Sequence, residues 1–219
     1  MSGSQLVDRW QKLHGELDKQ DVTLLAVSKY NSDEEITELA AAGHVDFAES
    51  RPQALRDRAQ KFPNLHWHMI GPVQKNKAKY VGQYASVWHS LCDITVAEKV
   101  AESVVGRQLP VLLQVNISGE RQKFGIPPNE VSVLLEKVKA VPNLKVIGLM
   151  GMAAKNDGSD DENVRRNFRA LRSLRDELAD ESLSELCMGM SGDFRIAVEE
   201  GATMVRLGTV LFGTRSINP

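Results

Sequence analysis

The sequence is poor in cysteine and has no long hydrophobic run. Its two cysteines, Cys92 and Cys187, lie far apart inside apolar segments, a pattern that fits a reducing compartment better than a disulfide scaffold. No apolar stretch is long enough to span a bilayer, and the first residues carry no apolar block suited to a signal peptide. These absences argue against secreted, disulfide-stapled and membrane-spanning proteins and predict a soluble, cytoplasmic one.

An excess of either charge is also missing. The chain has 27 basic and 29 acidic residues, which gives a formal net charge of -2, and no long run of one sign occurs. Proteins that attract nucleic acid or anionic lipid through their overall field carry a clear positive excess, so we expect neither partner. What the chain does contain is apolar material, because 42% of its 219 residues are hydrophobic, which is enough for a substantial core.

Short apolar runs alternate with helical patterns along the whole chain. One helical face near the start is formed by Leu6, Trp10, Leu13 and Leu17. Ser32, with Glu35 three residues later, has the spacing of a capping box that opens a further helix. The runs expected as strands cover residues 23–30, 46–51, 65–72, 86–92, 109–117, 144–152, 184–191 and 203–213. Runs that are apolar throughout, rather than alternating, are typical of parallel strands covered by helices.

This repeat predicts a single (β/α)8 TIM barrel that occupies residues 1–219 as one domain. A doubly wound open sheet is the alternative, because the number of strands alone does not distinguish the two. No linker rich in Pro, Gly or Ser divides the chain. The one notably polar insertion, residues 155–163, falls between a strand and its helix, where a barrel can accept an exposed loop.

In such a barrel, function belongs at the carboxyl ends of the strands. Two segments of small residues, 188–193 (MGMSGD) and 205–209 (VRLGT), follow or close the last two runs. Their glycines let backbone N–H groups approach an anion, and Ser191 and Thr209 add hydroxyl groups. Each segment alone could be a helix cap or a glycine turn, but together they predict a phosphate site.

Lys29 stands where the first apolar run stops, although a lysine at that point is ordinarily a solvated strand end. Closure of the barrel would bring the first strand beside the eighth, and Lys29 close to the phosphate. The lysine could simply pair with that anion. Alternatively, burial and the neighbouring Arg206 could lower its pKa and make it a nucleophile toward the aldehyde of pyridoxal 5′-phosphate (PLP).

These residues resemble the pyridoxal phosphate homeostasis proteins, which are single barrels similar to the N-terminal domain of alanine racemase. The matching segments span residues 26–215 and read AVSK, HWHMIGPVQKNK, VNIS, GLM, CMGMSGDF and VRLGTVLFGTR. The combination of HWHMIGPVQKNK with MGMSGD is specific. The resemblance implies a protein that holds PLP and contributes to its homeostasis, with PLP-dependent apoenzymes as further partners and a monomer or weak dimer as the assembly.

The resemblance also implies roles for individual residues. Lys29 would form the internal aldimine, and Arg206 would face the pyridine nitrogen, where a cation disfavours ring protonation and weakens the electron sink. The phosphate would be held by Ser191, by the backbone around Gly189 and Met190, and by Gly208 and Thr209. The other positions expected around the cofactor are His68, Ser50, Asn116 and Met150.

Two stretches depart from the family. It usually has a threonine and a proline soon after the lysine and reads FGEN before the next arginine, whereas this chain reads SKYNSDEE and FAESR. Ser50 therefore stands where an amide side chain is expected near the cofactor, and the contact made by that amide is in question here.

A carrier is expected rather than an enzyme. Racemases built on this barrel use a second domain that supplies a tyrosine, whereas this chain ends directly after the eighth run. Its tyrosines are Tyr30, Tyr80 and Tyr84, and none is a clear second base: Tyr30 should point away from Lys29, and the other two lie in a helical pattern. Weak racemase-like activity is the enzyme alternative.

A metal-dependent barrel hydrolase is the third alternative. It would use His66 and His68, which share one face of a strand, and His89 on the next strand. A complete site needs further ligands, so we expect one packing histidine and one pocket histidine, and no bound metal.

Overall fold

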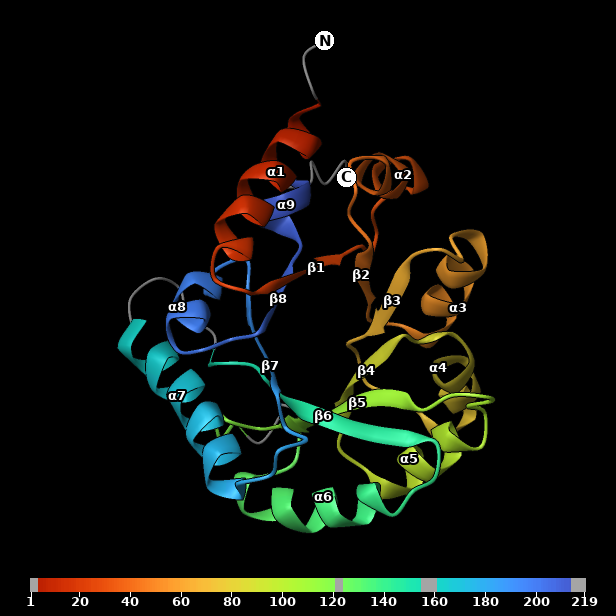
Figure 1. Ribbon diagram of the computed structural model, residues 1–219, viewed down its shortest axis with the longest axis vertical. Coiled ribbons are helices and arrows are strands. Elements are labelled where there is room, and N and C mark those ends of the chain that lie inside the picture. Colours follow the sequence, from red (N-terminus) through yellow and green to blue (C-terminus); the bar gives the residue numbers. More distant parts are fainter. Residues whose placement is uncertain (1–3, 121–123, 155–160, 214–219) are drawn as a thin grey trace.

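The computed structural model describes residues 4–120, 124–154 and 161–213, in which parallel strands close into a barrel in sequence order (Figure 1). The strands are β1 (Thr23–Val27), β2 (Asp46–Glu49), β3 (His66–Met69), β4 (Val87–Leu91), β5 (Leu109–Val115), β6 (Leu144–Gly151), β7 (Glu185–Met190) and β8 (Met204–Leu207). β1 pairs with both β2 and β8, for example Leu25 with Arg206. The predicted (β/α)8 barrel is confirmed, and the open sheet is wrong.

Helices surround the strands (Figure 1). They are α1 (Gln5–Asp18), α2 (Asp33–Ala41), α3 (Pro52–Lys61), α4 (Ala78–Tyr84), α5 (Ile94–Ala101), α6 (Val131–Lys139), α7 (Asp161–Leu178), α8 (Phe194–Glu199) and α9 (Thr209–Phe212), with short 3-10 turns at Lys75–Lys77 and Pro128–Glu130. Among the residues described, no helix is both long and apolar enough to cross a membrane. Most of the polar insertion expected as an exposed loop lies outside the described residues.

Local signals in the sequence explain how several helices begin. Both halves of the predicted capping box of α2 are present, because Ser32 Oγ accepts from the Glu35 N–H at 3.3 Å and the Glu35 carboxylate accepts from the Ser32 N–H at 2.8 Å. Ser4 caps α1 with its side chain alone, because its Oγ accepts from the N–H groups of Leu6 and Val7. The apolar face predicted for α1 is buried, so this helix is held by packing as well as by its cap.

The core has two layers. Leu24 and Ala26 of β1 face outward and pack between the strands and the helices, whereas Leu25 faces the barrel interior. The interior is packed with side chains from several strands, including Ala48, Leu112, Met150 and Cys187. It is therefore a core and not a pore.

The last expected strand is wrong in its second half. β8 ends at Leu207, and Thr209–Phe212 forms the short helix α9. Gly208 breaks the strand with φ -114 and ψ -84, and the hydroxyl of Ser191 accepts hydrogen bonds from the N–H groups at the start of the helix. A short apolar run can be strand or helix, and here a tertiary contact decides.

Candidate functional site

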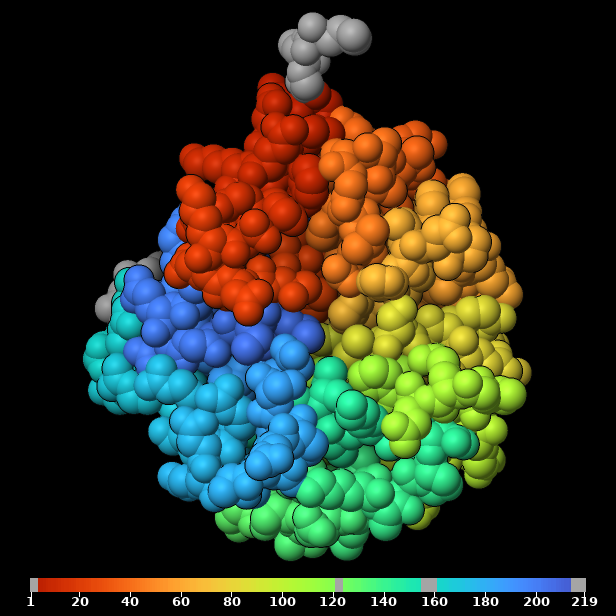
Figure 2. Space-filling view, viewed as in Figure 1, coloured from red at the N-terminus to blue at the C-terminus, as the bar shows by residue number. Residues whose placement is uncertain are grey.

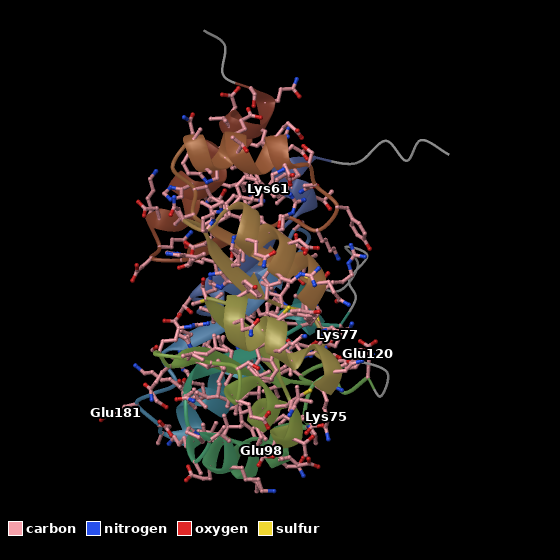
Figure 3. The ribbon with its side chains drawn as sticks, turned by 90° about the vertical axis from the view of Figure 1, so that its right-hand side faces the viewer. Lys61, Lys75, Lys77, Glu98, Glu120 and Glu181 are labelled. Atoms are coloured by element: carbon pink, nitrogen blue, oxygen red, sulfur yellow. The ribbon has the colours of Figure 1, made fainter. Side chains whose placement is uncertain are left out.

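The two ends of the barrel carry different residues. Figure 3 shows Lys75, Lys77 and Glu120, which follow strands, toward one edge, and Glu181, which precedes β7, at the opposite edge. Figure 2 views the molecule from the end at which the strands begin. The candidate site lies at the other end, where Lys29 and Ser191 follow β1 and β7.

Lys29 lies two residues beyond β1, in a turn, and its side chain is exposed. This exposure agrees with the ordinary interpretation of a lysine at a strand end as solvated, and the structure does not show the burial that would lower the pKa of an activated lysine. The turn lies beside the end of β8, because a Cβ placed on Gly208 would be 3.7 Å from Cβ of Val27. Closure of the barrel thus brings Lys29 next to the segment that was predicted to hold an anion.

Polar side chains behind Lys29 fix this turn. Ser28 Oγ donates to Glu49 Oε1 at 2.8 Å, and Arg58 Nη2 donates to the carbonyl of Asn31 at 2.5 Å. Glu49 is 2% exposed, and burial raises the pKa of its carboxyl group despite the Ser28 hydrogen bond. We did not predict this cluster, although a glutamate directly after the apolar Phe47 and Ala48 was a signal for it.

Tyr30 follows Lys29 with a left-handed φ of 69. The alternation argument that placed its side chain does not apply, because β1 has already ended at Val27. The ring is 69% exposed, and the Arg51 guanidinium lies 5.6 Å from its centroid. Tyr30 therefore stands at the surface of the same barrel end as Lys29.

The two segments of small residues come together as expected. Ser191 Oγ accepts from the N–H of Gly208 at 3.2 Å and from that of Val210 at 3.3 Å. Gly189 has a φ of 96, and a Cβ on it would lie 2.7 Å from Cβ of Ala197, so only glycine lets α8 approach β7 this closely. Thr209, the first residue of α9, is exposed.

The backbone of Met190 is already engaged. Its N–H donates to Asp193 Oδ1 at 2.6 Å, so this group is not open toward an anion. Burial raises the pKa of Asp193, although Arg206 and the Met190 N–H act in the opposite direction.

Arg206 lies inside the barrel and is 4% exposed. Its Nη2 donates to the carbonyl of Gly151 at 3.1 Å, and Nη1 lies 3.4 Å from Sδ of Met150. Its Nε is buried without a hydrogen-bond partner among the residues described. β7 pairs with β8 so that Met190 lies beside Arg206, and the backbone of Arg206 is therefore next to the Ser191 segment.

His68 occupies a different part of the barrel. Its Nε2 lies 3.3 Å from Asp46 Oδ1, and its Nδ1 lies 2.8 Å from His89 Nε2. One ring nitrogen thus contacts Asp46 at the start of β2, and the other contacts His89 on β4. His66, which is exposed, contacts the same oxygen of Asp46 at 3.0 Å.

These histidines do not gather metal ligands. Across residues 4–120, 124–154 and 161–213, no group of three or more His, Cys, Asp or Glu side chains is placed to hold a metal ion. His66 and His68 instead both contact the same carboxylate oxygen of Asp46 at hydrogen-bond distances.

Ser50 and Asn116 follow β2 and β5. Ser50 lines a cavity of about 360 Å³ together with Arg51, Gln74, Lys77 and others. The side chain of Asn116 is used within its own loop, where Nδ2 donates to the carbonyl of Glu120 at 2.9 Å. Both residues thus lie at the carboxyl end, as predicted.

Comparison with known proteins agrees with this geometry. The family model for the alanine racemase N-terminal domain matches residues 2–216. The pyridoxal phosphate homeostasis protein of Aquifex aeolicus is 40% identical over 199 residues, covering 88% of this chain and 86% of that protein. The protein of the same name from Vibrio alginolyticus is 37% identical over 206 residues, covering 90% and 88%.

Solved structures give the same result. PipY of Synechococcus elongatus without PLP is 32% identical, with a TM-score of 0.87 over 95% of this chain and 100% of that one. The PLP-bound form of PipY is 30% identical, with a TM-score of 0.84 and the same coverage of both chains. An alanine racemase from Clostridium difficile, at 16% identity and a TM-score of 0.74, covers 96% of this chain and 57% of its own, and shows the fold alone.

The family match extends over nearly the whole chain, and the curated relatives named above cover most of it as well. The resemblance noted in the sequence is thereby confirmed. The chain belongs to the alanine racemase N-terminal domain family.

Proposed function

We propose that this chain binds pyridoxal 5′-phosphate at the carboxyl end of its barrel and helps to maintain the supply of the cofactor, without robust catalysis of its own. The observation that carries the proposal is that the turn with Lys29, the Ser191–Gly208 contact and Arg206 belong to neighbouring strands at this barrel end. The names of the curated relatives and the PLP-bound PipY structure support it.

The residues present fit the chemistry of this ligand. When bound, PLP supplies an aldehyde that condenses with a primary amine. Lys29 offers that amine, and the Ser191 hydroxyl, whose oxygen accepts from the N–H groups of Gly208 and Val210, can donate its proton to a phosphate. The unpartnered Arg206 Nε is a buried donor that a ring nitrogen could satisfy.

Arg206 also favours holding over catalysis. A guanidinium beside a pyridine nitrogen disfavours protonation of that nitrogen, and a neutral ring withdraws electrons poorly. We infer that the chain stores the cofactor or passes it to PLP-dependent apoenzymes, as a monomer or weak dimer. The curated relatives carry the name of homeostasis proteins and not the name of an enzyme, which is consistent with this role.

A racemase-like enzyme is the second candidate, and Tyr30 is the observation that favours it. Tyr30 is exposed and directly follows Lys29 in the same turn, so a phenol and the lysine belong to the same barrel end. Incubation of the PLP-loaded protein with L-alanine, followed by chiral chromatography, tests this candidate. Turnover that disappears in Tyr30→Phe would replace the carrier role with an enzymatic one, and no turnover would favour the carrier.

The binding proposal is tested by incubating the purified protein with PLP, recording the absorption spectrum, reducing with borohydride and mapping the modified peptide. We expect a visible absorption band and one reduced adduct on Lys29, both lost in Lys29→Ala. Lys75→Ala, which changes another exposed lysine that follows a strand, is the matched control and should keep both. Adducts spread over surface lysines would overturn the assignment of Lys29.

An assay of PLP transfer to an apoenzyme distinguishes storage of the cofactor from its direct delivery. In one arrangement, a dialysis membrane separates the PLP-loaded protein from a PLP-dependent apoenzyme. In the other, both proteins share one chamber, and the rate of apoenzyme activation is compared between the two. Faster activation in the shared chamber would support direct delivery, whereas equal rates would leave buffering as the function.

A further inference from the structure

The short helix α9 depends on other parts of the protein for its position. It spans only Thr209–Phe212, and its turn is closed by hydrogen bonds from the N–H groups of Phe212 and Gly213 to the carbonyls of Gly208 and Thr209. A helix of this length is marginal in isolation, and the carbonyls of its last residues find no partner within the helix. Contacts at its two ends must therefore fix where it lies.

Ser191 holds the amino end of α9. Its Oγ accepts from the N–H of Gly208 at 3.2 Å and from that of Val210 at 3.3 Å. A serine hydroxyl has two acceptor lone pairs and one donor proton. Because these two N–H groups occupy both lone pairs, the proton is the part of the hydroxyl left for a ligand. Ser191 is thus preset as a donor, which suits an anion.

Arg9 of α1 holds the carboxyl end of the same helix. Its Nε donates to the carbonyl of Leu211 at 2.6 Å, and its Nη2 donates to the carbonyl of Phe212 at 3.2 Å. A Cβ placed on Gly213 would be 3.7 Å from Nη2 of Arg9, so the guanidinium lies against the backbone where α9 ends. One planar fork of donors thus serves two carbonyls, and their partial negative charge favours a cation there.

The two helices in contact are both anchored in the core. Figure 1 shows α1 beside α9, although they stand near opposite ends of the sequence. Trp10, which directly follows Arg9, belongs to the buried face of α1, and Leu211 of α9 is 0% exposed. Core packing therefore fixes the depth of α9, whereas Ser191 and Arg9 fix its two ends.

We propose that Arg9 is a positioning residue for the anion contact of Ser191. By holding the carboxyl end of α9, Arg9 keeps the N–H groups of Gly208 and Val210 on Ser191 Oγ. The hydroxyl proton then stays directed to a bound phosphate. Arg9 acts through the helix, from the end opposite Ser191, and its effect on PLP rests on the function proposed above.

Arg107 offers a matched control, because it makes the same kind of contact elsewhere. Its Nη2 donates to the carbonyls of Gly82 at 3.1 Å and Ala85 at 2.8 Å, at the carboxyl end of α4. Arg107 precedes β5 and so lies at the end of the barrel opposite the candidate site. Methionine at either position removes a guanidinium from the carbonyls of a short helix, but only Arg9 contacts the helix that Ser191 holds.

Amide hydrogen exchange, followed by NMR in the cofactor-free protein, tests the link through α9. We expect Arg9→Met to speed exchange at Gly208 and Val210 about tenfold, the effect of about one lost hydrogen bond. Arg107→Met should leave both rates unchanged and instead speed exchange at Ala85, whose N–H closes the last turn of α4. Wild-type rates at Gly208 and Val210 in Arg9→Met would overturn the proposal.

The dissociation constant for PLP tests the link from α9 to the candidate site. Arg9→Met should raise it about threefold to tenfold, the range for one misdirected hydrogen bond, and Arg107→Met should leave it unchanged. The urea midpoints of both variants should fall, because each loses a contact of the same kind. An equal rise of the dissociation constant in both variants would reveal a general loss of stability and overturn the specific role of Arg9.

Two further variants test the route. Arg9→Lys keeps the charge but not the fork of donors, so its dissociation constant should fall between those of the wild type and Arg9→Met. If Arg9→Met does not fold, Arg9→Lys and Arg107→Lys replace the methionine pair. If Arg9 acts through Ser191, the double variant Arg9→Met/Ser191→Ala should match Ser191→Ala alone. Effects that multiply would overturn this route.

The two proposals fail in different ways. If the wild-type protein does not take up PLP, the proposed function fails, and the exchange rates at Gly208 and Val210 still decide whether Arg9 holds α9. If PLP binds but Arg9→Met keeps the wild-type dissociation constant, the positioning role is overturned and the proposed function stands.

Discussion

Ser191 and Gly208 are joined by a hydrogen bond in which the serine hydroxyl oxygen accepts from the glycine N–H at 3.2 Å. The bond links the segment that follows β7 to the residue that ends β8. It places a hydroxyl and backbone N–H groups of two loops at one point of the barrel end. An anion bound there would contact both loops at once.

Ser191→Ala should therefore weaken PLP binding more than it weakens the fold. Loss of one charge-assisted hydrogen bond to phosphate should raise the dissociation constant about tenfold. The two N–H groups that lose their acceptor should cost about 1 kcal/mol in the free energy of unfolding. Fluorescence titration and urea denaturation measure the two effects. Ser173→Ala on the exposed side of α7 is the control, and an unchanged dissociation constant for Ser191→Ala would contradict the expectation.

Arg206→Met should separate stability from binding. Among the residues described, Arg206 has neutral hydrogen-bond acceptors and no carboxylate partner, so its burial is costly. Replacement by an apolar side chain of similar length should raise the free energy of unfolding of the cofactor-free protein by about 1 kcal/mol. PLP affinity should fall about tenfold or more. Urea denaturation and PLP titration of Arg206→Met and the exposed control Arg166→Met give the answer; loss of stability with unchanged affinity would refute it.

Glu49→Gln should change how stability depends on pH. Burial raises the folded-state pKa of Glu49, so its contribution is most favourable below the unfolded pKa of about 4.3 and is lost as pH rises through the folded pKa. The amide cannot ionise and still accepts from Ser28. Relative to the wild type, the variant should become more stable as pH rises above about 4.3.

Chemical denaturation at several pH values measures this difference. Glu177→Gln, at an exposed position of α7, should follow the wild-type profile. A constant difference between Glu49→Gln and the wild type across the range would show that Glu49 does not titrate in the expected window.

Gly189→Ala and Gly192→Ala form a matched pair in one loop. Gly189 has a φ of 96 and no room for a Cβ, whereas a Cβ on Gly192 would meet nothing within 4 Å. Strain and overpacking should cost Gly189→Ala about 2–4 kcal/mol in the free energy of unfolding. Gly192→Ala should change it by less than about 0.5 kcal/mol. Equal effects in urea denaturation would mean that the approach of α8 to β7 does not depend on glycine.

Much of the fold could be predicted because its signals are local. Continuous apolar runs followed by helical patterns indicate parallel strands, and Ser32 with Glu35 marks the start of α2 without reference to any distant residue. The carboxyl ends of the strands then bring Lys29, Ser191 and Gly208 to one end of the barrel. The boundary between β8 and α9 was missed because it depends on Ser191, which lies 17 positions earlier.

The candidate site was harder to predict, because the exposure and the contacts of its side chains depend on how distant elements pack. The sequence left open whether Lys29 is buried, and the structure shows that its side chain is exposed. Glu49 and Arg58 support the turn after β1 through contacts between different elements, which no spacing in the sequence reveals. His68 was expected near the cofactor, but both of its ring nitrogens bond to Asp46 and His89. Side-chain direction inside a barrel depends on register and tilt, which a list of strands does not provide.

The hydrogen bonds from Arg9 of α1 to the carbonyls of Leu211 and Phe212, at 2.6 and 3.2 Å, set the order in which the protein can be completed. They join residues 202 and 203 positions apart, and they hold the carboxyl end of the helix whose amino end meets Ser191. During synthesis, Arg9 can form these hydrogen bonds only after Leu211 and Phe212 have been made. The barrel end that carries Ser191 and Gly208 is complete only once these two parts of the chain have met, so we expect no finished candidate site before the barrel closes.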